Sequence, residues 1–212
     1  MNDPVNIDLK TWKRKNHFKF YKNFSDPYFN ICCDLDVSQV VKLSKENKTS
    51  TFFTLLYLSS KACNHIDAFK LRLTTQAELG VEQYQLVHPA ATMLKDDDTF
   101  TFCYFDFDDE MDRFIEKALL AKEQALIAEP LANIKNRADH IFYSVIPWLN
   151  FTSFKHANSG GGLGQPKIVF GKIHQENNKY LMPVSVELHH ALCDGIDVAK
   201  YIECFQQEIN TL

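Results

Sequence analysis

The sequence predicts an α/β (α+β) protein in which short, largely antiparallel strands pack with amphipathic helices. Three observations predict this class. Between residues 69 and 105, and again from 141 to 188, short runs of alternating apolar and polar residues are separated by turn residues, as in antiparallel strands. Elsewhere, apolar residues recur every three or four positions, as on one face of a helix. No Pro-, Gly- or Ser-rich linker divides the 212 residues, so we expect one domain over 1–212.

The composition favours a globular protein and argues against nucleic acid as a partner. Hydrophobic residues make up 45% of the chain, enough for a substantial core, and 23 Lys and Arg face 27 Asp and Glu. The resulting net charge of -4 leaves no basic surplus to bind a phosphate backbone. No stretch approaches the ~20 apolar residues of a membrane span, and residues 1–8 have no signal-peptide pattern. The six scattered cysteines form no Cys-x-x-Cys pair. We therefore expect a cytoplasmic protein with no membrane partner.

Helical periodicity is found in five segments. Residues 51–64 are apolar on nearly all sides, which predicts a helix buried between other layers. Acidic residues begin the segment 108–127, and the pair Glu129 and Pro130 ends it. The remaining helical segments are residues 11–21, residues from 36 onward and residues 196–205.

Alternating polarity predicts the strands. The segment 167–174 and the segment 180–188 are expected to form a hairpin around residues 175–178. The other predicted strands are 28–35, 69–73, 84–87, 91–94, 100–105 and 141–146.

Two polar segments allow a ligand interpretation beside a structural one. Residues 95–98 read Lys-Asp-Asp-Asp, and clustered carboxylates attract hard cations. No Gly follows at the spacing of an EF-hand, however, and acids between two strands are typical of a solvated hairpin tip. Residues 158–164 read Asn-Ser-Gly-Gly-Gly-Leu-Gly but lack the Lys-Ser/Thr of a phosphate-binding loop and open into no helix. A loop is the better interpretation.

Candidate chemistry gathers where a predicted strand becomes a predicted helix, at residues 188–195. An imidazole titrates near neutral pH, so His190 has the chemistry of a general base. Asp194 is placed to brace the turn by pairing with a cation, and Gly195 permits backbone shapes that a Cβ disfavours. A base of this kind suits acyl transfer, which also needs an oxyanion donor. On spacing alone, other interpretations stay open: one core and one surface histidine, or two ligands of an incomplete metal site.

Three motifs follow in order along nearly the full length. Residues 12–18 read Trp-Lys-Arg-Lys-Asn-His-Phe, the segment 144–154 begins Ser-Val-Ile-Pro-Trp, and residues 189–195 read His-His-Ala-Leu-Cys-Asp-Gly, preceded by Leu-Met-Pro at 181–183. The last motif matches the His-His-x-x-x-Asp-Gly signature of coenzyme A-dependent acyltransferases. Together they resemble the Trp-x-Arg-x-x-His-Phe, Ser-x-x-Pro-Trp and signature motifs of the chloramphenicol acetyltransferase family.

The resemblance implies a two-layer α/β sandwich with a mixed sheet, assembled as a homotrimer with active sites between subunits. By this resemblance His190 is the general base, Asp194 a structural aspartate, Arg14 its partner and Ser144 the donor to the tetrahedral oxyanion. It further implies coenzyme contacts at Lys172 and Trp148, and an acceptor pocket at Phe20, Tyr21 and Phe100.

Departures from the family pattern concern the acceptor side. Val169 stands where the family commonly has a threonine. His156 and Lys167 lie near positions that are usually hydrophobic in the drug pocket, and residues 158–164 replace a more apolar stretch. A polar wall of this kind should bind an aromatic, chlorinated acceptor less well.

The expected activity is transfer of acetyl from acetyl-CoA to a small-molecule hydroxyl, chloramphenicol by resemblance, with no metal cofactor. Two alternatives remain open: an acetyltransferase with another hydroxyl acceptor, and a non-catalytic protein that binds a coenzyme or small molecule. A metal-dependent hydrolase is a further alternative.

Overall fold

The computed structural model describes residues 3–74, 79–129, 131, 134, 137–158 and 162–212. Its main element is a seven-stranded sheet in the order β2-β10-β8-β7-β5-β6, with β9 paired to β10. The β5–β7 and β7–β8 pairs are parallel and the others antiparallel, which confirms the predicted mixed, largely antiparallel sheet. The strands are β2 (Tyr28–Asp36), β5 (His88–Leu94), β6 (Phe100–Tyr104), β7 (His140–Val145), β8 (Lys167–Phe170), β9 (His174–Glu176) and β10 (Lys179–His189).

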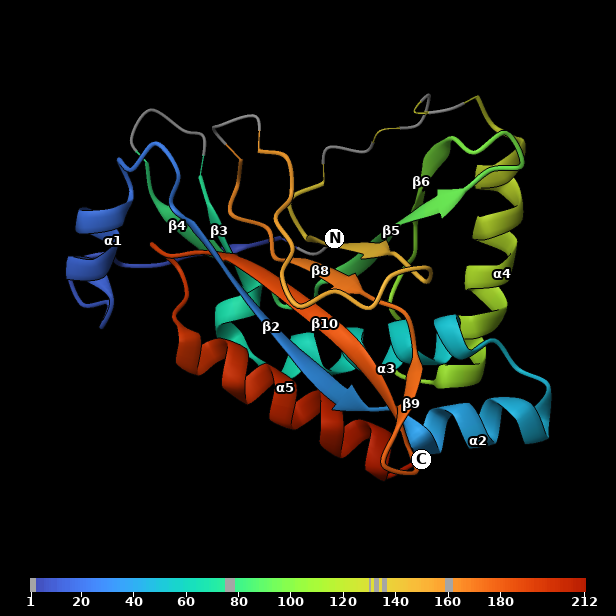
Figure 1. Ribbon diagram of the computed structural model, residues 1–212. Helices are drawn as coiled ribbons and strands as arrows, with labels where there is room; N and C mark the ends of the chain where they lie inside the picture. The colour runs from blue at the N-terminus through green and yellow to red at the C-terminus, as the bar shows by residue number, and fades with distance from the viewer. Residues whose placement is uncertain (1–2, 75–78, 130, 132–133, 135–136, 159–161) are drawn as a thin grey trace.

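Helices cover one face of this sheet, as Figure 1 shows. They are α2 (Ser38–Asn47), α3 (Thr51–His65), α4 (Met111–Ile127) and α5 (Gly195–Asn210), while the short α1 (Lys15–Tyr21) lies at one end. A 3-10 turn, η1 (Asp67–Lys70), leads into a small antiparallel sheet of β1 (Val5–Asn6), β4 (Val81–Gln83) and β3 (Leu71–Leu73). No helix among the described residues is long and apolar enough to cross a membrane.

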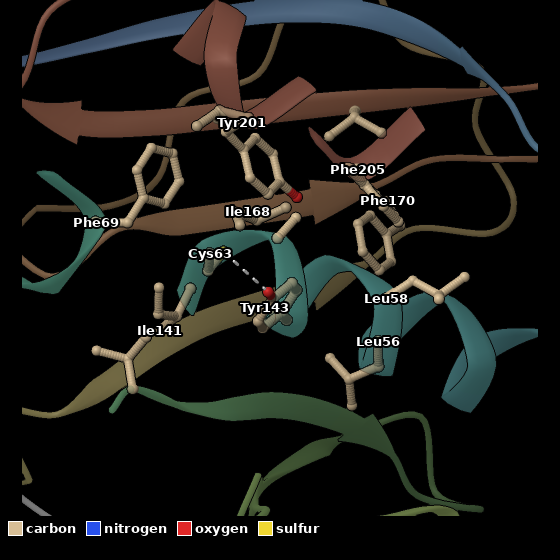
Figure 2. Packing of buried hydrophobic residues seen from close by; sticks show 14 of the residues in the cluster. Leu56, Leu58, Cys63, Phe69, Ile141, Tyr143, Ile168, Phe170, Tyr201 and Phe205 are labelled. Carbon is tan, nitrogen blue, oxygen red and sulfur yellow. Dashed lines mark hydrogen bonds between the residues drawn. The ribbon is translucent and has the colours of Figure 1, made fainter. Parts of the chain in front are cut away.

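The core lies between the sheet and the helices. Helix α3 is buried from Phe53 to Ser60, as its apolar sequence predicts. Tyr143 of β7 and Tyr201 of α5 both bond the hydroxyl of Ser59, at 2.9 and 2.6 Å, so these three buried hydroxyls are paired. Figure 2 shows the aromatic and aliphatic side chains that fill the layer around them.

Alternate residues of the strands point to opposite faces of the sheet. In β10, Val184, Val186 and Leu188 belong to the core. Ser185, Glu187 and His189 therefore point to the opposite side, which we call the outer face. These three are nevertheless buried, because residues 151–158 and 162–164 lie over part of this face. Gly164, with φ +76°, packs so closely there that an added Cβ would come within 2.6 Å of Leu192.

The predicted strand at 84–87 is wrong. Strand β4 ends at Gln83, and the side-chain amide of Asn64 then takes both backbone groups of Val87, accepting from its N–H at 2.8 Å and donating to its carbonyl at 3.0 Å. These bonds occupy the groups that a neighbouring strand would need. Within the segment, Val87 is buried, Tyr84 and Leu86 are partly buried and Gln85 is exposed, so the alternating polarity reflects burial without strand pairing.

Other boundaries also differ. Phe69 belongs to η1 and not to a strand, and the predicted strand 167–174 divides at Gly171 into β8 and β9. The hairpin turn lies at Asn177 and Asn178, both with positive φ. Residues 95–98 form the tip between β5 and β6, as expected, where Asp97 accepts bonds from Thr99. The described residues hold no group of three or more His, Cys, Asp or Glu arranged to bind a metal ion.

Candidate active site

The strand-to-helix junction is present as predicted. β10 ends at His189 and α5 begins at Gly195. Asp194 is the N-cap of α5 and forms a capping box with Asp197, whose carboxylate accepts the Asp194 N–H at 2.8 Å. Gly195 does not use the backbone freedom that a glycine has, since Gly164 is the glycine with positive φ among the described residues. A Cβ at Gly195 would make only an ordinary contact with Ile31.

The ring of His190 is held from two sides. Its Nδ1 lies 3.2 Å from the carbonyl of Cys193 and 3.0 Å from Oδ1 of Asp194. The ring stacks on Tyr21, with centroids 4.1 Å apart, and contacts Phe29 at 4.7 Å. In the part of the chain that the structure describes, Nε2 has no hydrogen-bond partner. With the proton on Nδ1, this nitrogen presents a free lone pair.

Arg14 ties the start of α1 to the junction. It forms an ion pair with Asp194, and its Nη2 donates to the carbonyls of His190 and Cys193, at 2.9 and 3.2 Å. The guanidinium beside Asp194 lowers the pKa of that carboxyl, against the opposing effect of burial. We call His190, Asp194 and Arg14 the junction cluster. The planar guanidinium of Arg14 thus donates to several acceptors of the turn between β10 and α5. The position of the His190 ring therefore depends on a residue 176 positions earlier in the chain.

Aromatic side chains surround the open side of His190. Tyr21 stacks on it, and Phe20, 64% exposed, packs edge-on against Tyr21. Phe20 and Tyr21 were predicted from the sequence, but Phe24 and Phe29 were not; these contact Tyr21 and His190 respectively. No local pattern distinguishes them, because Phe24 lies in a loop and Phe29 is one of several apolar residues of β2.

Ser144 does not meet His190 within one chain. The pairing register sets Ser144 opposite Val169 and Val169 opposite Ser185. His190 lies five residues beyond Ser185 along the same chain direction, about 16 Å further, and two strands away. Phe100 is also remote, because β6 is separated from β10 by three strands. It is 48% exposed at the sheet edge.

The remaining candidate residues lie on the outer face or beside it. Val169 is fully buried and shares that face with Ser144. Trp148 and Lys172 are both exposed, and the Lys172 N–H donates to Leu149 at 2.9 Å, which brings their segments together. The N–H of His156 donates to a carboxylate oxygen of Glu187 at 3.1 Å. Of the glycine-rich segment, residues 159–161 lie outside the described residues.

A family model described as chloramphenicol acetyltransferase matches residues 2–206. The chain belongs to the chloramphenicol acetyltransferase family. Chloramphenicol acetyltransferase 3 of Escherichia coli is 28% identical, with 97% of this chain and 96% of that protein covered. The chloramphenicol acetyltransferase of Vibrio anguillarum is 27% identical, with 97% and 94% covered.

Solved structures agree with this assignment at the level of the fold. One chloramphenicol acetyltransferase superposes with a TM-score of 0.90 at 22% identity, covering 98% of this chain and all of that one. A dihydrolipoamide acetyltransferase of Azotobacter vinelandii shares the fold more distantly, with a TM-score of 0.66 at 11% identity over 92% of this chain and 85% of that one. Membership in the chloramphenicol acetyltransferase family makes the chain an acetyltransferase.

Proposed function

We propose that the chain transfers acetyl from acetyl-CoA to a hydroxyl of chloramphenicol, within one ternary complex. The observation that carries this proposal is the ring of His190, which is fixed at Nδ1 and open at Nε2. A fixed imidazole with one free nitrogen is what removal of a hydroxyl proton requires. The acetylated antibiotic would be inactivated, so the chain would confer resistance.

The reaction proceeds in two steps. Nε2 of His190 takes the acceptor proton while the acceptor oxygen attacks the thioester carbonyl, and the hydroxyl of Ser144 donates to the oxyanion that forms. The tetrahedral intermediate then expels the coenzyme thiolate, which recovers the proton from the imidazolium. The products are the acetyl ester and free coenzyme A. An oxyanion donor of this kind typically contributes about 2.7 to 4 kcal/mol of transition-state stabilisation.

The coenzyme side of the site is proposed at Trp148 and Lys172. Both side chains are exposed on segments that the Lys172-to-Leu149 hydrogen bond joins. The ammonium group of Lys172 can pair with a phosphate of the coenzyme. The indole of Trp148 supplies an apolar surface against which the coenzyme can pack. All six cysteines of the chain are free thiols, which fits the reducing cytoplasm where we place the protein.

We further propose a homotrimer whose sites combine His190 of one copy with Ser144 of another. Within one chain, Ser144 and His190 are separated by about 16 Å along the strands. This is too far for both side chains to contact the same reacting group of a substrate, which supports a site shared between copies. Equal amounts of His190→Ala and Ser144→Ala chains, co-expressed, should recover about one quarter of the wild-type activity, because random assembly joins intact halves in that share of sites. Sedimentation should give three times the chain mass of 24.5 kDa. Recovery no higher than the background of either variant would contradict the shared site.

The decisive test of function is incubation with chloramphenicol and acetyl-CoA. Mass analysis should show the acetyl ester, and a thiol reagent should report release of coenzyme A. His190→Ala should lower the rate of both signals by about a hundredfold or more. If this variant keeps full activity, the proposed mechanism is wrong.

A further inference from the structure

A carboxylate is buried on the outer face of β10, three residues before His190. Glu187 is 2% exposed. Its Oε1 lies 3.0 Å from Nζ of Lys167, and its Oε2 accepts the His156 N–H at 3.1 Å. Burial alone raises the pKa of Glu187, but the contacts from His156 and Lys167 outweigh it and lower the pKa to about 2. Glu187 is therefore a fixed negative charge inside the protein at any physiological pH.

Lys167 balances this charge without using all of its donors. One of its three N–H groups meets Glu187, and its Nζ lies 4.7 Å from the centroid of the Tyr28 ring. The other two N–H groups of the Lys167 ammonium require a polar partner or water as acceptor. The side chain keeps 17% of its surface exposed, so a partner can reach it.

His156 completes the group and leaves a polar atom unpaired. Its side chain is 16% exposed, with Nδ1 3.6 Å from Oε2 of Glu187, beyond hydrogen-bond reach. Among the described residues, Nδ1 is buried without a hydrogen-bond partner, although such atoms are normally paired. We call His156, Lys167 and Glu187 the outer-face cluster.

The position of this cluster connects it to the proposed acceptor site. Lys167 and Val169 are alternate residues of β8, and Val169 lies opposite Ser144. Glu187 of β10 pairs with Lys167 of β8, and His190 follows the end of β10. On the outer face, the cluster therefore lies beside Val169 and the strand of Ser144, in the half of the shared site that one copy contributes and that His190 of another copy would complete.

We propose that the outer-face cluster forms a wall of the acceptor pocket and makes chloramphenicol a more weakly bound acceptor than a neutral polyol. This inference rests on the proposed function and deepens it. The aromatic or chlorinated part of chloramphenicol, placed against the cluster, would cover donors of the ammonium group and an imidazole nitrogen without bonding them, which is unfavourable. Hydroxyl groups can both donate and accept there. The charges of Lys167 and Glu187 cancel, so an ionic acceptor gains nothing from them.

The test compares binding of chloramphenicol and of two neutral polyols, uridine and methyl α-D-glucopyranoside, by calorimetry without acetyl-CoA. His156→Leu removes a ring that makes no side-chain hydrogen bond and keeps the backbone bond to Glu187, so the fold should survive. The triple variant His156→Leu, Lys167→Val and Glu187→Gln removes both charges together. We expect chloramphenicol to bind roughly threefold more tightly to the single variant and at least tenfold more tightly to the triple variant, with polyol binding weakened.

A matched control is the pair Lys61→Met and Glu208→Gln, which removes an ion pair of 2.7 Å between α3 and α5 in the helix layer. It should change neither affinity. If the wild-type chain binds neither polyol, or if both cluster variants fold but bind chloramphenicol no more tightly, the inference is overturned. These are binding measurements, so they are independent of the transfer assay: a chain that shows the binding shifts but transfers no acetyl contradicts the proposed function alone.

Discussion

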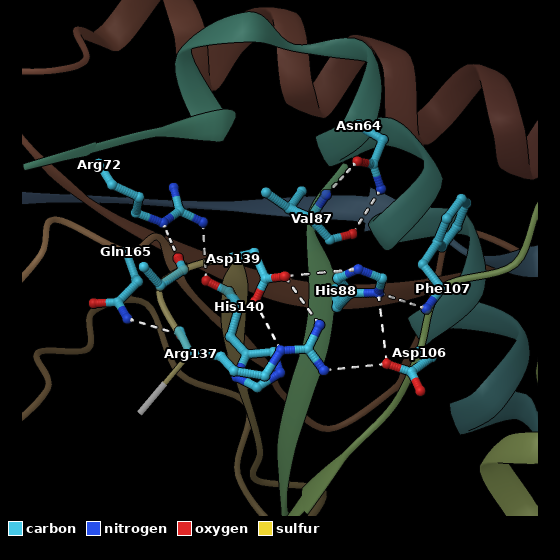
Figure 3. A network of polar contacts seen from close by, with 11 residues as sticks. Asn64, Arg72, Val87, His88, Asp106, Phe107, Arg137, Asp139, His140 and Gln165 are labelled. Carbon is cyan, nitrogen blue, oxygen red and sulfur yellow. Dashed lines mark hydrogen bonds and ion pairs between the residues drawn. The ribbon is translucent and has the colours of Figure 1, made fainter. Parts of the chain in front are cut away.

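The chain contains the same three residue types, a histidine, an aspartate and an arginine, in two separate clusters. One is the junction cluster. The other, which we call the buried cluster, is drawn in Figure 3 and consists of His88, Asp139 and Arg137. In the buried cluster Arg137 donates two hydrogen bonds to the Asp139 carboxylate, of 3.0 and 2.9 Å. The composition of the two clusters is alike, but their surroundings differ.

The difference lies in the ring nitrogens. His88 is buried, its Nδ1 accepts the Phe107 N–H at 3.0 Å, and its Nε2 lies 3.9 Å from the Asp139 carboxylate. Both nitrogens thus face groups of the protein. The His190 side chain is 31% exposed, with its Nε2 open beside aromatic rings. A histidine with carboxylate and guanidinium neighbours is therefore not a catalytic group by composition, since it also needs a nitrogen that a substrate can reach.

The largest expected contrast comes from removing each imidazole. His190→Ala should lower kcat by about 10²- to 10⁴-fold, because a general base contributes that much, while the unfolding midpoint changes little. His88→Ala should do the reverse: it leaves the Phe107 N–H without its acceptor and should lower the free energy of unfolding by about 1 to 3 kcal/mol, with kcat of the folded enzyme near wild type. Steady-state kinetics and urea unfolding of both variants measure this. A large loss of kcat in folded His88→Ala would contradict the assignment of His190 to catalysis and His88 to stability.

A smaller contrast is expected from the two arginines. Arg14→Met keeps the apolar stem but loses the bonds to Asp194 and to the carbonyls of the turn. The His190 ring should then lose its position, and kcat should fall about tenfold to hundredfold, with a lesser change in KM for acetyl-CoA. Arg14→Lys should not restore kcat, because an ammonium group cannot serve the same acceptors. Arg137→Met is the matched variant and should affect stability and not kcat. Equal kinetic losses in both would contradict the assignment of Arg14 as a positioning residue.

The last contrast concerns pH. Burial lowers the pKa of His88, and burial with the neighbouring His190 lowers that of His189 to about 4. Both rings are thus protonated more readily in the unfolded chain, whose pKa is ~6.5. Their contribution to stability is complete above pH 6.5 and is lost as the pH falls toward 4, by about 3 kcal/mol at most for His189. Urea unfolding between pH 7.5 and 4.5 should show this decline.

The variant that checks this pH dependence is His189→Asn, whose amide oxygen can replace Nδ1 as acceptor of the Ala191 N–H, a bond of 3.2 Å. It should flatten the decline. His65→Gln is the control, since the side chain of His65 is 58% exposed and should leave the decline unchanged. If the slope is the same in both variants, His189 does not carry the effect.

Much of the local structure was predictable because local patterns cause it. The alternation in β10 and the helical spacing after Ile196 predicted the junction, and the apolar surface of residues 51–64 predicted the buried helix α3. The strand predicted at 84–87 failed because the deciding partner, Asn64, is 23 residues away. Whether a backbone N–H or carbonyl pairs with a strand or with a side chain depends on which groups the tertiary structure brings near it. The periodicity of the sequence carries no information about such distant partners.

By itself, the sequence determined which residues alternate between the faces of β10, and its motifs identified the family and the residues of the junction cluster. It did not show that residues 151–158 and 162–164 lie over the outer face of that strand. This covering is what buries Glu187, and a buried carboxylate requires partners that an exposed one does not. Only the tertiary structure supplied them, from Lys167 and His156, which are 20 and 31 residues distant along the chain. Local motifs identify the family and the proposed base, whereas the proposed polar wall forms only where distant segments meet.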